Sequence, residues 1–302
     1  MSKLRHFQLG DMLMHESKSS RWKVETDSTR RWWLTLSHPS TGFDPRKHLS
    51  GFESRDEVLE RKKALIRILL TGEDHHHRLG TTLGICETGS RCGLSICPFC
   101  MRRFRSGFLI PEVCAQIARW QECTGESGVA VSVVPAKLKL AAGELHQLDL
   151  PKMLDAFRQR LRRAGYGGYI SINGVDLSFN ESSEGKWASH WQPHFYAVVL
   201  SANEPKQVKA ELGKFFPADE SVRVPVHVKR LNDPMRPVSY LWKPFFQRRV
   251  SYIATNGRLA ARKLPLRPDQ VREVALFFGE KAPTERLLFT GIRRRGQHLV
   301  EM

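Results

Sequence analysis

The centre of the predicted fold is residues 168–200, which read GYISINGVDLSFNESSEGKWASHWQPHFYAVVL. Two runs rich in β-branched and aromatic residues, about Gly168 to Phe179 and about His190 to Ser201, predict two strands. The segment between them, Asn180 to Gly185, is rich in turn-forming residues. We therefore expect two neighbouring antiparallel strands joined by a turn.

The elements around this pair of strands alternate between strand and helix patterns. They are a helix at 108–122, a strand at Val129–Val134, a helix at Leu150–Ala164, a helix opened by Asn203 and Pro205 that runs to Phe216, and a strand at Val222–Val228. From Val129 on, the order is strand-helix-strand-strand-helix-strand, which is typical of the split βαβ, ferredoxin-like arrangement. The sequence therefore predicts an α+β fold with an antiparallel sheet and helices on one face.

Further helices are expected on both sides of this core. Ser54 and Glu57 form a capping-box pattern ahead of an apolar helical repeat that ends at Gly72. After the core, about Met235 to Tyr252 and about Pro268 to Phe278 have helical patterns.

The chain divides into four predicted parts. Its 302 residues allow one large domain or two ordinary ones, at roughly 150 residues per domain. The parts are a basic, Trp-rich N-terminal extension (1–80), a cysteine cluster (81–106), a central α+β domain (107–252), and a basic C-terminal helix and tail (253–302).

The charge balance points to an acidic partner. The chain has 48 Lys and Arg against 31 Asp and Glu, which gives a formal net charge of +17. Phosphate neutralisation by Lys and Arg supplies most of the sequence-independent affinity for nucleic acid, so DNA or RNA is the leading partner. The arginines that we expect to contact nucleic acid are Arg102, Arg103, Arg105, Arg248 and Arg249. A basic surface that only confers solubility is the alternative interpretation.

The hydropathy pattern does not favour a membrane protein. The longest uncharged apolar stretches, such as Phe195 to Ser201, are far shorter than the roughly 20 residues needed to span a bilayer. The first residues carry positive charge, but no apolar segment follows them. We therefore expect a cytoplasmic protein with no membrane partner.

Four of the six cysteines, Cys86, Cys92, Cys97 and Cys100, fall within fifteen residues. In a cytosolic chain such clustering indicates metal binding rather than disulfides. A CxxC turn supplies two thiolates to structural zinc, and a second pair nearby completes the tetrahedron. We predict a structural Zn²⁺ site, with a histidine of the run 75–77 as the alternative to Cys86 or Cys92. The arginines directly after the last cysteine would then be held on a fixed surface, suited to a phosphate backbone.

One face of the predicted strand at 190–201 is polar. With period-two alternation, His190, Gln192, His194 and Tyr196 point to the same side. Two imidazoles on that side could bind a divalent metal, and Asp176 on the neighbouring strand could add a carboxylate. A polar sheet face whose groups satisfy one another is the alternative.

A third group of residues lies in PVSYLWKPFFQRR, residues 237–249. Tyr240 and Lys243 are one helical turn apart and would share a face of the expected helix. A tyrosine there could be a covalent nucleophile. On spacing alone, a packing role is favoured.

Five segments together carry a resemblance to a known family. In order they are RCGLSICPFCMRR, VAVSVVP, GYISINGVDLSFN, WQPHFYAVVL and VSYLWKPF. With them, the chain resembles the rolling-circle replication initiators of small bacterial plasmids, members of the HUH endonuclease superfamily. The resemblance covers about residues 86–252, just over half of the chain, and depends on the order and spacing of the motifs.

The resemblance implies an activity and its residues. Family members bind a replication origin and nick one strand with a tyrosine, leaving a 5′-phosphotyrosine. Tyr240 would be the nucleophile, Lys243 would help to hold the scissile phosphate, and His194 with Asp176 would hold Mg²⁺ or Mn²⁺. The implied partner is DNA, as an origin duplex or a single strand, and 107–252 would be the HUH-like domain.

The chain departs from the family pattern at three positions. Tyr196 stands where the family has the second histidine of its pair, and Gln192 stands where another histidine is common. A phenol is a poorer ligand for Mg²⁺ or Mn²⁺ than imidazole, and His190 is about 13 Å of strand from His194. Arg236 replaces a glutamate that activates water in many plasmid initiators.

These departures leave two hypotheses for the function. In the first, loss of the glutamate favours rejoining by a strand hydroxyl over hydrolysis, and the protein nicks and rejoins DNA. The alternative is a non-catalytic, zinc-containing nucleic-acid-binding protein or regulator derived from such an initiator.

Overall fold

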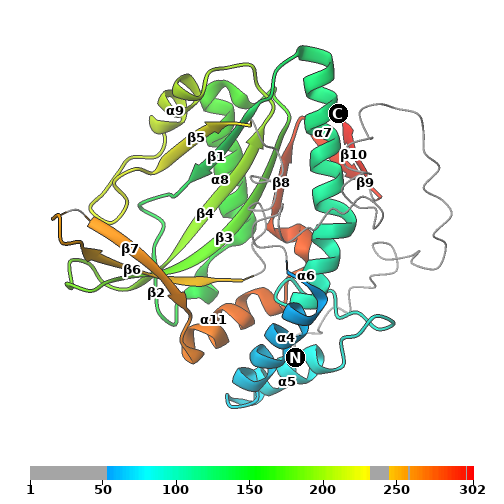
Figure 1. The fold of residues 1–302 in the computed structure, drawn as a ribbon, viewed down its shortest axis with the longest axis vertical. Coiled ribbons are helices and arrows are strands. Elements are labelled where there is room, and N and C mark those ends of the chain that lie inside the picture. Colours follow the sequence, from blue (N-terminus) through cyan, green and yellow to red (C-terminus); the bar gives the residue numbers. More distant parts are fainter. Residues whose placement is uncertain (1–52, 232–244, 258, 297) are drawn as a thin grey trace.

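The computed structural model describes residues 53–231, 245–257, 259–296 and 298–302 (Figure 1). The Trp-rich part of the predicted extension, residues 1–52, lies outside the described residues. Tyr240, Lys243 and Arg236 lie outside them as well. Among the helices of the described part, none is both long and apolar enough to cross a bilayer.

The strands of the main sheet are β1 (Val129–Val133), β2 (Leu140–Ala141), β3 (Ser171–Ser182), β4 (His190–Val199), β5 (Val226–Arg230), β6 (Gln247–Ile253), β7 (Leu259–Pro265) and β8 (Leu287–Thr290). Their order is β5-β1-β4-β3-β6-β7, with β2 paired to β4 and β8 paired to β3. All neighbours are antiparallel except β3 and β6, which are parallel. The molecule is thus an α+β fold with a mixed, curled sheet, as Figure 1 shows.

The predicted pair of strands, β3 and β4, is confirmed. Ten residue pairs form its ladder, from Ser171 opposite Val199 to Asn180 opposite His190. Gly185 in the connecting loop has a φ of 65°, a left-handed conformation that favours glycine. Because side chains alternate along a strand, this ladder has an apolar face and a polar face.

Three helices cover the apolar face of the sheet. They are α8 (Leu150–Leu161), α9 (Pro205–Gly213) and α11 (Pro268–Gly279). The alternating residues Val129, Val131 and Val133 of β1 are buried in the same apolar cluster. Phe157 of α8 stacks on Phe195 of β4 with ring centroids 4.0 Å apart.

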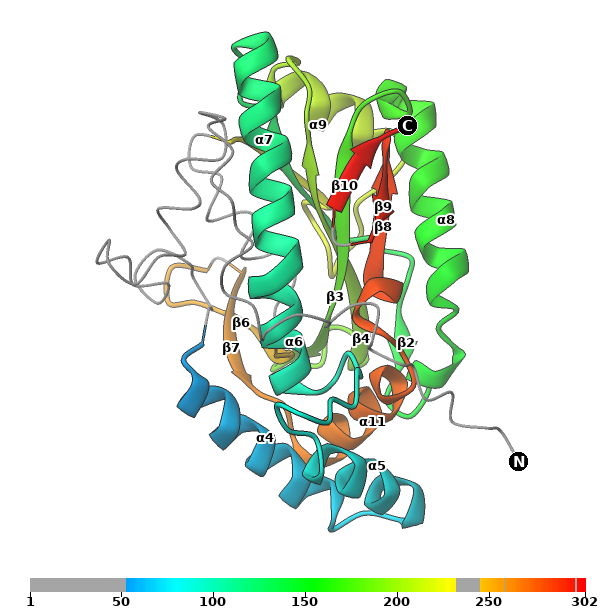
Figure 2. The same cartoon turned by 90° about the vertical axis from the view of Figure 1, so that its right-hand side faces the viewer.

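A long helix covers part of the opposite face of the sheet (Figure 2). It consists of α6 (Pro98–Phe104), the π-helical turn η3 (Arg105–Leu109) and α7 (Ile110–Thr124). Leu109, Val113 and Ile117 recur every four residues and form a second apolar cluster with Ile172 and Val198 of the sheet. We expected helices on one face only, and this apolar stripe explains why a helix also packs on the other.

The helix predicted for 235–252 is wrong in its C-terminal part. Gln247–Ile253 form strand β6, which pairs with β3 and β7. Pro244 has no backbone N–H to donate within a helix. Val250 and Ile253 are β-branched, and such residues favour a strand. Residues 235–244 of this prediction lie outside the described residues.

The C-terminal segment contains more strands than the sequence predicted. The expected helix is present as α11. Strand β7, which precedes α11 in the chain, and strand β8, which follows it, both belong to the main sheet. In addition, β9 (Ile292–Arg295) and β10 (His298–Glu301) form a hairpin that contacts α7. These strands have only four residues each, too few to show a clear alternation in the sequence.

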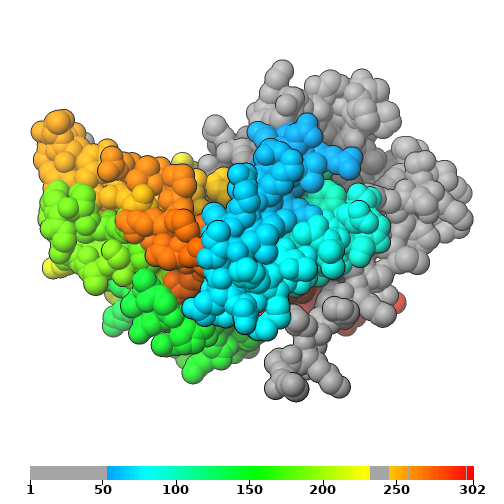
Figure 3. Space-filling model, turned by 90° about the horizontal axis from the view of Figure 1, so that it is seen from below, coloured from blue at the N-terminus to red at the C-terminus, as the bar shows by residue number. Residues whose placement is uncertain are grey.

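Two N-terminal helices, α4 (Arg55–Leu69) and α5 (Asp74–Gly84), pack against α11 (Figure 3). The predicted capping box is confirmed at the start of α4. Ser54 Oγ accepts a hydrogen bond from the amide of Glu57, and the Ser54 amide donates to Glu57 Oε2. The two helices bring the chain to the segment that contains the cysteines.

Candidate metal centre and polar sheet face

The four predicted zinc ligands lie together between α5 and α6. Cys86 follows α5, Cys92 lies in the loop, Cys97 is the N-cap of α6, and Cys100 is in its first turn. All four Sγ atoms lie within 4.8 Å of one another. The Cys86 sulfur is 3.5 Å from that of Cys100 and 3.6 Å from that of Cys97, and the Cys92 and Cys100 sulfurs are 3.7 Å apart.

These sulfur positions fit a tetrahedral zinc ion. Zinc–sulfur bonds of about 2.3 Å in a tetrahedron imply sulfur–sulfur separations of about 3.8 Å. The three short separations, 3.5, 3.6 and 3.7 Å, are close to this value. Cys97 is 0% exposed, and Cys86 and Cys100 are also buried. A closed set of four sulfur ligands is typical of a structural site, and the cluster is consistent with structural zinc.

The protonation of the cluster also favours a cation. Hydrogen bonds from the other thiols, that of Cys100 above all, hold the pKa of Cys86 far below its usual value. The pKa values of Cys97 and Cys100 are raised by these same sulfur–sulfur hydrogen bonds and by burial. Thiolate is the form that binds a metal, and Zn²⁺ would stabilise several thiolates at once.

Residues outside the cluster hold its backbone in place. The ammonium group of Lys62 in α4 donates to the carbonyl of Cys86 at 2.5 Å and to that of Gly84 at 3.3 Å. The amide of Cys92 donates to Cys86 Sγ at 3.4 Å. Sequence reasoning missed Lys62, which is 8% exposed and on another element. Its only signal is a lysine on the apolar side of a helical repeat.

The histidine run at 75–77 does not join the cluster. These residues lie at the start of α5, and Nδ1 of His76 accepts a hydrogen bond from the amide of Glu73 at 3.0 Å. Burial lowers the pKa of His76. Within the described part of the chain, the metal-ligand group contains the four cysteines and no histidine.

The second candidate site is the polar face of β3 and β4. The ladder sets Asp176 directly opposite His194, and each is 5% exposed. Directly opposite residues have Cβ atoms about 4.5–5.5 Å apart. Both side chains alternate in step with Ile172 and Val198, so they point away from α8. The structure therefore brings the two predicted ligands of the divalent ion together.

A short chain of hydrogen bonds orients the ring of His194. Its Nε2 lies 2.8 Å from Ser178 Oγ, and that hydroxyl donates to Asn180 Oδ1 at 2.9 Å. A hydroxyl has one hydrogen, so the serine oxygen accepts the Nε2 hydrogen of His194. In the neutral form of the ring the lone pair is then on Nδ1, the atom with which His194 would bind a metal ion.

A buried arginine lies close to Asp176. Arg286, at the end of the 3-10 helix η6 (Pro283–Arg286), is 1% exposed and donates twice to the carbonyl of Val175, at 2.8 and 3.3 Å. Burial lowers the pKa of Arg286 to about 10, and the charge of Asp176 acts in the opposite direction. The guanidinium also lies 4.5 Å from the ring centroid of Phe278. Sequence reasoning missed this arginine because it is more than a hundred residues from β3.

Two other predicted residues of the polar face have structural partners. The side-chain amide of Gln192 donates to the carbonyls of Pro135 and Leu138, at 2.9 and 3.0 Å. Gln192 therefore holds the loop that follows β1. Nδ1 of His190 lies 2.8 Å from the carbonyl of Ala188, and burial lowers the pKa of this histidine.

Tyr196 lies beside His194 on the same face. Their ring centroids are 6.3 Å apart, with planes inclined at 26°. Opposite Tyr196 on β1 is Ser132, and opposite Ser132 on β5 is the exposed His227. Sequence reasoning missed His227, although the alternation of β5 could have placed it on this face. At about 4.8 Å per strand it is roughly 10 Å from β4, too far to share a metal with His194.

The arginines predicted near the cysteine cluster differ in exposure. Arg102 and Arg103 are half-buried, and Nε of Arg102 donates to the carbonyl of Glu53 at 3.0 Å. Arg105 is 2% exposed, and burial lowers its pKa to about 10. In this structure the guanidinium of Arg105 is inside the protein and not at the surface where we expected it.

The two arginines predicted on the later segment lie on β6. Arg248 forms an ion pair with Glu181 at 2.8 Å. Arg249 is directly opposite Lys263 of β7, and like charges in such pairs are destabilising. An anion bound to the β6–β7 hairpin would relieve this repulsion.

Comparisons with known proteins do not assign the chain to a family. No family model matches it, and neither the curated proteins nor the solved structures contain a match.

Proposed function

We propose that this chain is an HUH-type, replication-initiator-like protein that binds DNA and nicks and rejoins one strand through a tyrosine–phosphodiester intermediate. The observation that carries the proposal is the pairing of His194 with Asp176, an imidazole directly opposite a carboxylate on adjacent strands. These are the two residues that the resemblance implies as ligands of Mg²⁺ or Mn²⁺. Imidazole and carboxylate together suit such an ion.

The order of the strands supports a ferredoxin-like core. The elements β1, α8, β3, β4, α9 and β5 follow one another in the chain, and their strands are ordered β5-β1-β4-β3. β4 therefore lies between β1 and β3 and is antiparallel to both. This order is the one expected of the split βαβ arrangement and supports that part of the proposal. It leaves His194 and Asp176 on the face opposite α8 and α9.

In the proposed reaction Tyr240 is the nucleophile and Lys243 holds the scissile phosphate. The tyrosyl oxygen loses its proton to water and forms a bond to phosphorus, while the bond from phosphorus to the 3′ oxygen breaks. That oxygen takes up a proton and leaves as a hydroxyl. A 3′ hydroxyl can later displace the tyrosine and restore the phosphodiester. A divalent ion held by His194 and Asp176 would supply charge to stabilise the phosphate oxygens.

A test compares the protein with its Tyr240→Phe variant on supercoiled and single-stranded DNA of the replicon that encodes it, with Mn²⁺. We expect a covalent protein–DNA adduct on a denaturing gel for the unchanged protein but not for the Tyr240→Phe variant. DNA binding should be nearly equal for the two proteins, because the substitution removes one oxygen. Equal cleavage by both would overturn the role of Tyr240.

The second candidate function is a non-catalytic, zinc-containing nucleic-acid-binding protein. Tyr196 in the place of a second histidine favours it, because a phenol is a poor ligand for Mg²⁺ or Mn²⁺. This candidate predicts salt-sensitive DNA binding without any adduct. It also predicts that binding tolerates His194→Ala but is lost with Cys97→Ser.

A further inference from the structure

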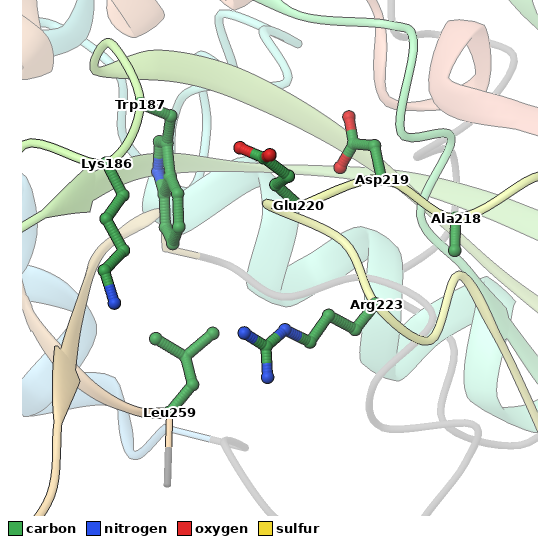
Figure 4. A pocket seen from close by; sticks show the side chains of 7 residues that line it. All are labelled: Lys186, Trp187, Ala218, Asp219, Glu220, Arg223 and Leu259. Atoms are coloured by element: carbon green, nitrogen blue, oxygen red, sulfur yellow. The ribbon is translucent and has the colours of Figure 1, made fainter. Parts of the chain in front are cut away.

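A pocket of about 660 Å³ lies at the loop end of the β3–β4 hairpin (Figure 4). Three segments line it: the loop between β3 and β4, the loop between α9 and β5, and the start of β7. The lining side chains that matter here are Lys186, Trp187, Asp219, Glu220, Arg223 and Leu259. We call this the Trp187 pocket. Its volume is within the range of small-molecule sites, about 300–1,000 Å³.

The position of the Trp187 side chain is not accounted for by packing in the core. Its indole Nε1 is buried and has no hydrogen-bond partner among the described residues, whereas the N–H of a buried tryptophan usually has one. Trp191, four residues later, shows the contrast, since it is 0% exposed and its Nε1 donates to Glu273 at 2.7 Å. Trp191 is a core residue, while the ring of Trp187 lines a pocket beside Lys186 and Glu220, as Figure 4 shows.

Cations border the ring of Trp187. Arg223 is exposed and makes no ion pair with any residue that the structure describes. Lys186 lies on the other side and pairs with Glu184 at 3.1 Å, where both side chains remain partly exposed. Such surface pairs contribute little and exchange readily for a stronger anion. A planar aromatic group and two cations on its flanks match a base with its phosphate.

The two carboxylates of the pocket have different roles. Asp219 forms an ion pair with Lys139 at 2.5 Å and accepts from the amides of Ser221 and Val222, so it shapes the loop. Burial acts to raise the pKa of Asp219, but these contacts together outweigh it and lower the pKa. Glu220 is exposed and points toward the ring of Trp187 (Figure 4). A carboxylate in this position can accept from the amino group of a base.

We propose that the Trp187 pocket takes one unstacked base of a single-stranded nucleic acid, with the indole against the base and Arg223 and Lys186 at the neighbouring phosphate. The proposal rests on the proposed function, because it names how the same protein would hold its single strand. A duplex keeps its base faces stacked, so the face of Trp187 is accessible only to an unpaired base. The hairpin that carries Trp187 also carries His194, seven residues later and at most about 23 Å away.

Fluorescence anisotropy with a labelled DNA single strand tests the proposal. The Tyr240→Phe variant serves as the parent and no divalent ion is added, so that neither cleavage nor the proposed metal affects the result. Base–aromatic stacking is worth about 1–3 kcal/mol, so adding Trp187→Ala should weaken binding roughly 5- to 100-fold. Trp187→Phe keeps an aromatic face and should lose clearly less.

The arginine is tested against a matched control. Arg223→Ala should reduce the slope of log K against log salt by about 0.7, the value for one phosphate contact of a single strand. Arg163→Ala removes the same charge from an exposed arginine of the π-helical turn after α8, outside the pocket. We expect this control to change the affinity less than Arg223→Ala does.

A second experiment changes the DNA instead of the protein, so it does not depend on whether Trp187→Ala folds normally. Abasic sites are placed one at a time along the oligonucleotide. Removing the base at one position should weaken binding by the parent most. The same removal should weaken binding by Trp187→Phe less and should have little effect on Trp187→Ala. Equal sensitivity of all three proteins at every position would overturn the proposal.

The outcomes separate this proposal from the proposed function. Binding that depends on Trp187, without any adduct in the cleavage assay, supports the pocket and overturns the nicking reaction. Adduct formation, together with single-strand binding that does not change when Trp187 or Arg223 is substituted, supports the nicking reaction and overturns the pocket. Binding of a free mononucleotide as tight as that of the oligonucleotide would overturn the assignment to a polymeric strand.

Discussion

The cysteine cluster and the polar sheet face are assembled in opposite ways. The four cysteines fall within fifteen residues, and two of them lie at the start of α6, one as its N-cap and one in its first turn. Asp176 and His194 instead meet through the register of two strands, and Arg286 reaches β3 from more than a hundred residues away. A local site of this kind is set by spacing, whereas the sheet site depends on every contact that fixes the register.

Because of this difference, substitutions in the cysteine cluster and on the polar sheet face should affect different parts of the molecule. Loss of a cysteine should affect the segment that the metal closes and the helices α4 and α5 that pack around it. A change on the sheet face should act through the central ladder, where a register shift by one residue would move His194 to the other face.

The largest expected effect is that of Cys97→Ser. Structural zinc contributes about 10–16 kcal/mol of apparent binding free energy in zinc-finger peptides, so loss of one ligand should release the ion. We expect the bound zinc to fall from one equivalent to near zero, and the melting temperature to fall by roughly 10 °C or more. Zinc analysis and thermal unfolding measure these changes.

The matched control is Cys123→Ser, because Cys123 is an exposed cysteine outside the cluster. This variant should keep its zinc and its melting temperature. If Cys97→Ser also keeps its zinc, the four cysteines do not form the metal site.

The next effect is that of Arg286→Ala, which tests the support of the sheet face. The substitution leaves the carbonyl of Val175 without its donor and removes the buried positive charge near Asp176. Breaking such a buried charged contact costs about 3–5 kcal/mol. Chemical denaturation should show this loss, while Arg293→Ala, an exposed arginine on β9, should change stability by less than about 0.5 kcal/mol. Similar values for both variants would contradict the role of Arg286.

Sequence reasoning succeeded where the determinants are local. The cysteine cluster, the capping box of Ser54 and the β3–β4 pair all depend on residues close together in the chain. The alternation of β4 also placed His194 on the correct face. The failures have a physical cause, since no local pattern shows that Gln247–Ile253 pairs in parallel with β3 or that Lys62 and Arg286 approach from distant elements. Such contacts are properties of the packed molecule.

A smaller effect is expected from Ser178→Ala, which sharpens the role of the sheet face. The substitution removes the acceptor of the His194 Nε2 hydrogen and leaves the Nδ1 lone pair less well oriented. If the proposed nicking occurs, the Mn²⁺ concentration for half-maximal adduct formation should rise about 10- to 100-fold, with little change in zinc content.

The control for this substitution is Ser132→Ala, a serine of β1 on the same face that lies opposite Tyr196. Its half-maximal Mn²⁺ concentration should stay near that of the unchanged protein. An equal shift for both serines would mean that the hydrogen bond to His194 does not set metal affinity.

The smallest expected effect is a pH dependence of stability through His190. Burial lowers the pKa of this ring in the folded protein, although the hydrogen bond to Ala188 acts in the opposite direction. The unfolded chain therefore binds a proton at His190 more readily than the folded protein does. The contribution of neutral His190 to folding stability is fully present above pH of about 6.5 and is lost as the pH falls through the lowered pKa. The Nε2 atom is buried, so a proton there would place a charge inside the protein, which burial disfavours. His190→Gln should flatten the decline in unfolding free energy between pH 7 and 5, measured by denaturant titration, whereas His227→Gln on the exposed side of β5 should leave it unchanged. An identical pH profile for His190→Gln and the unchanged protein would show that the burial of His190 does not oppose its protonation.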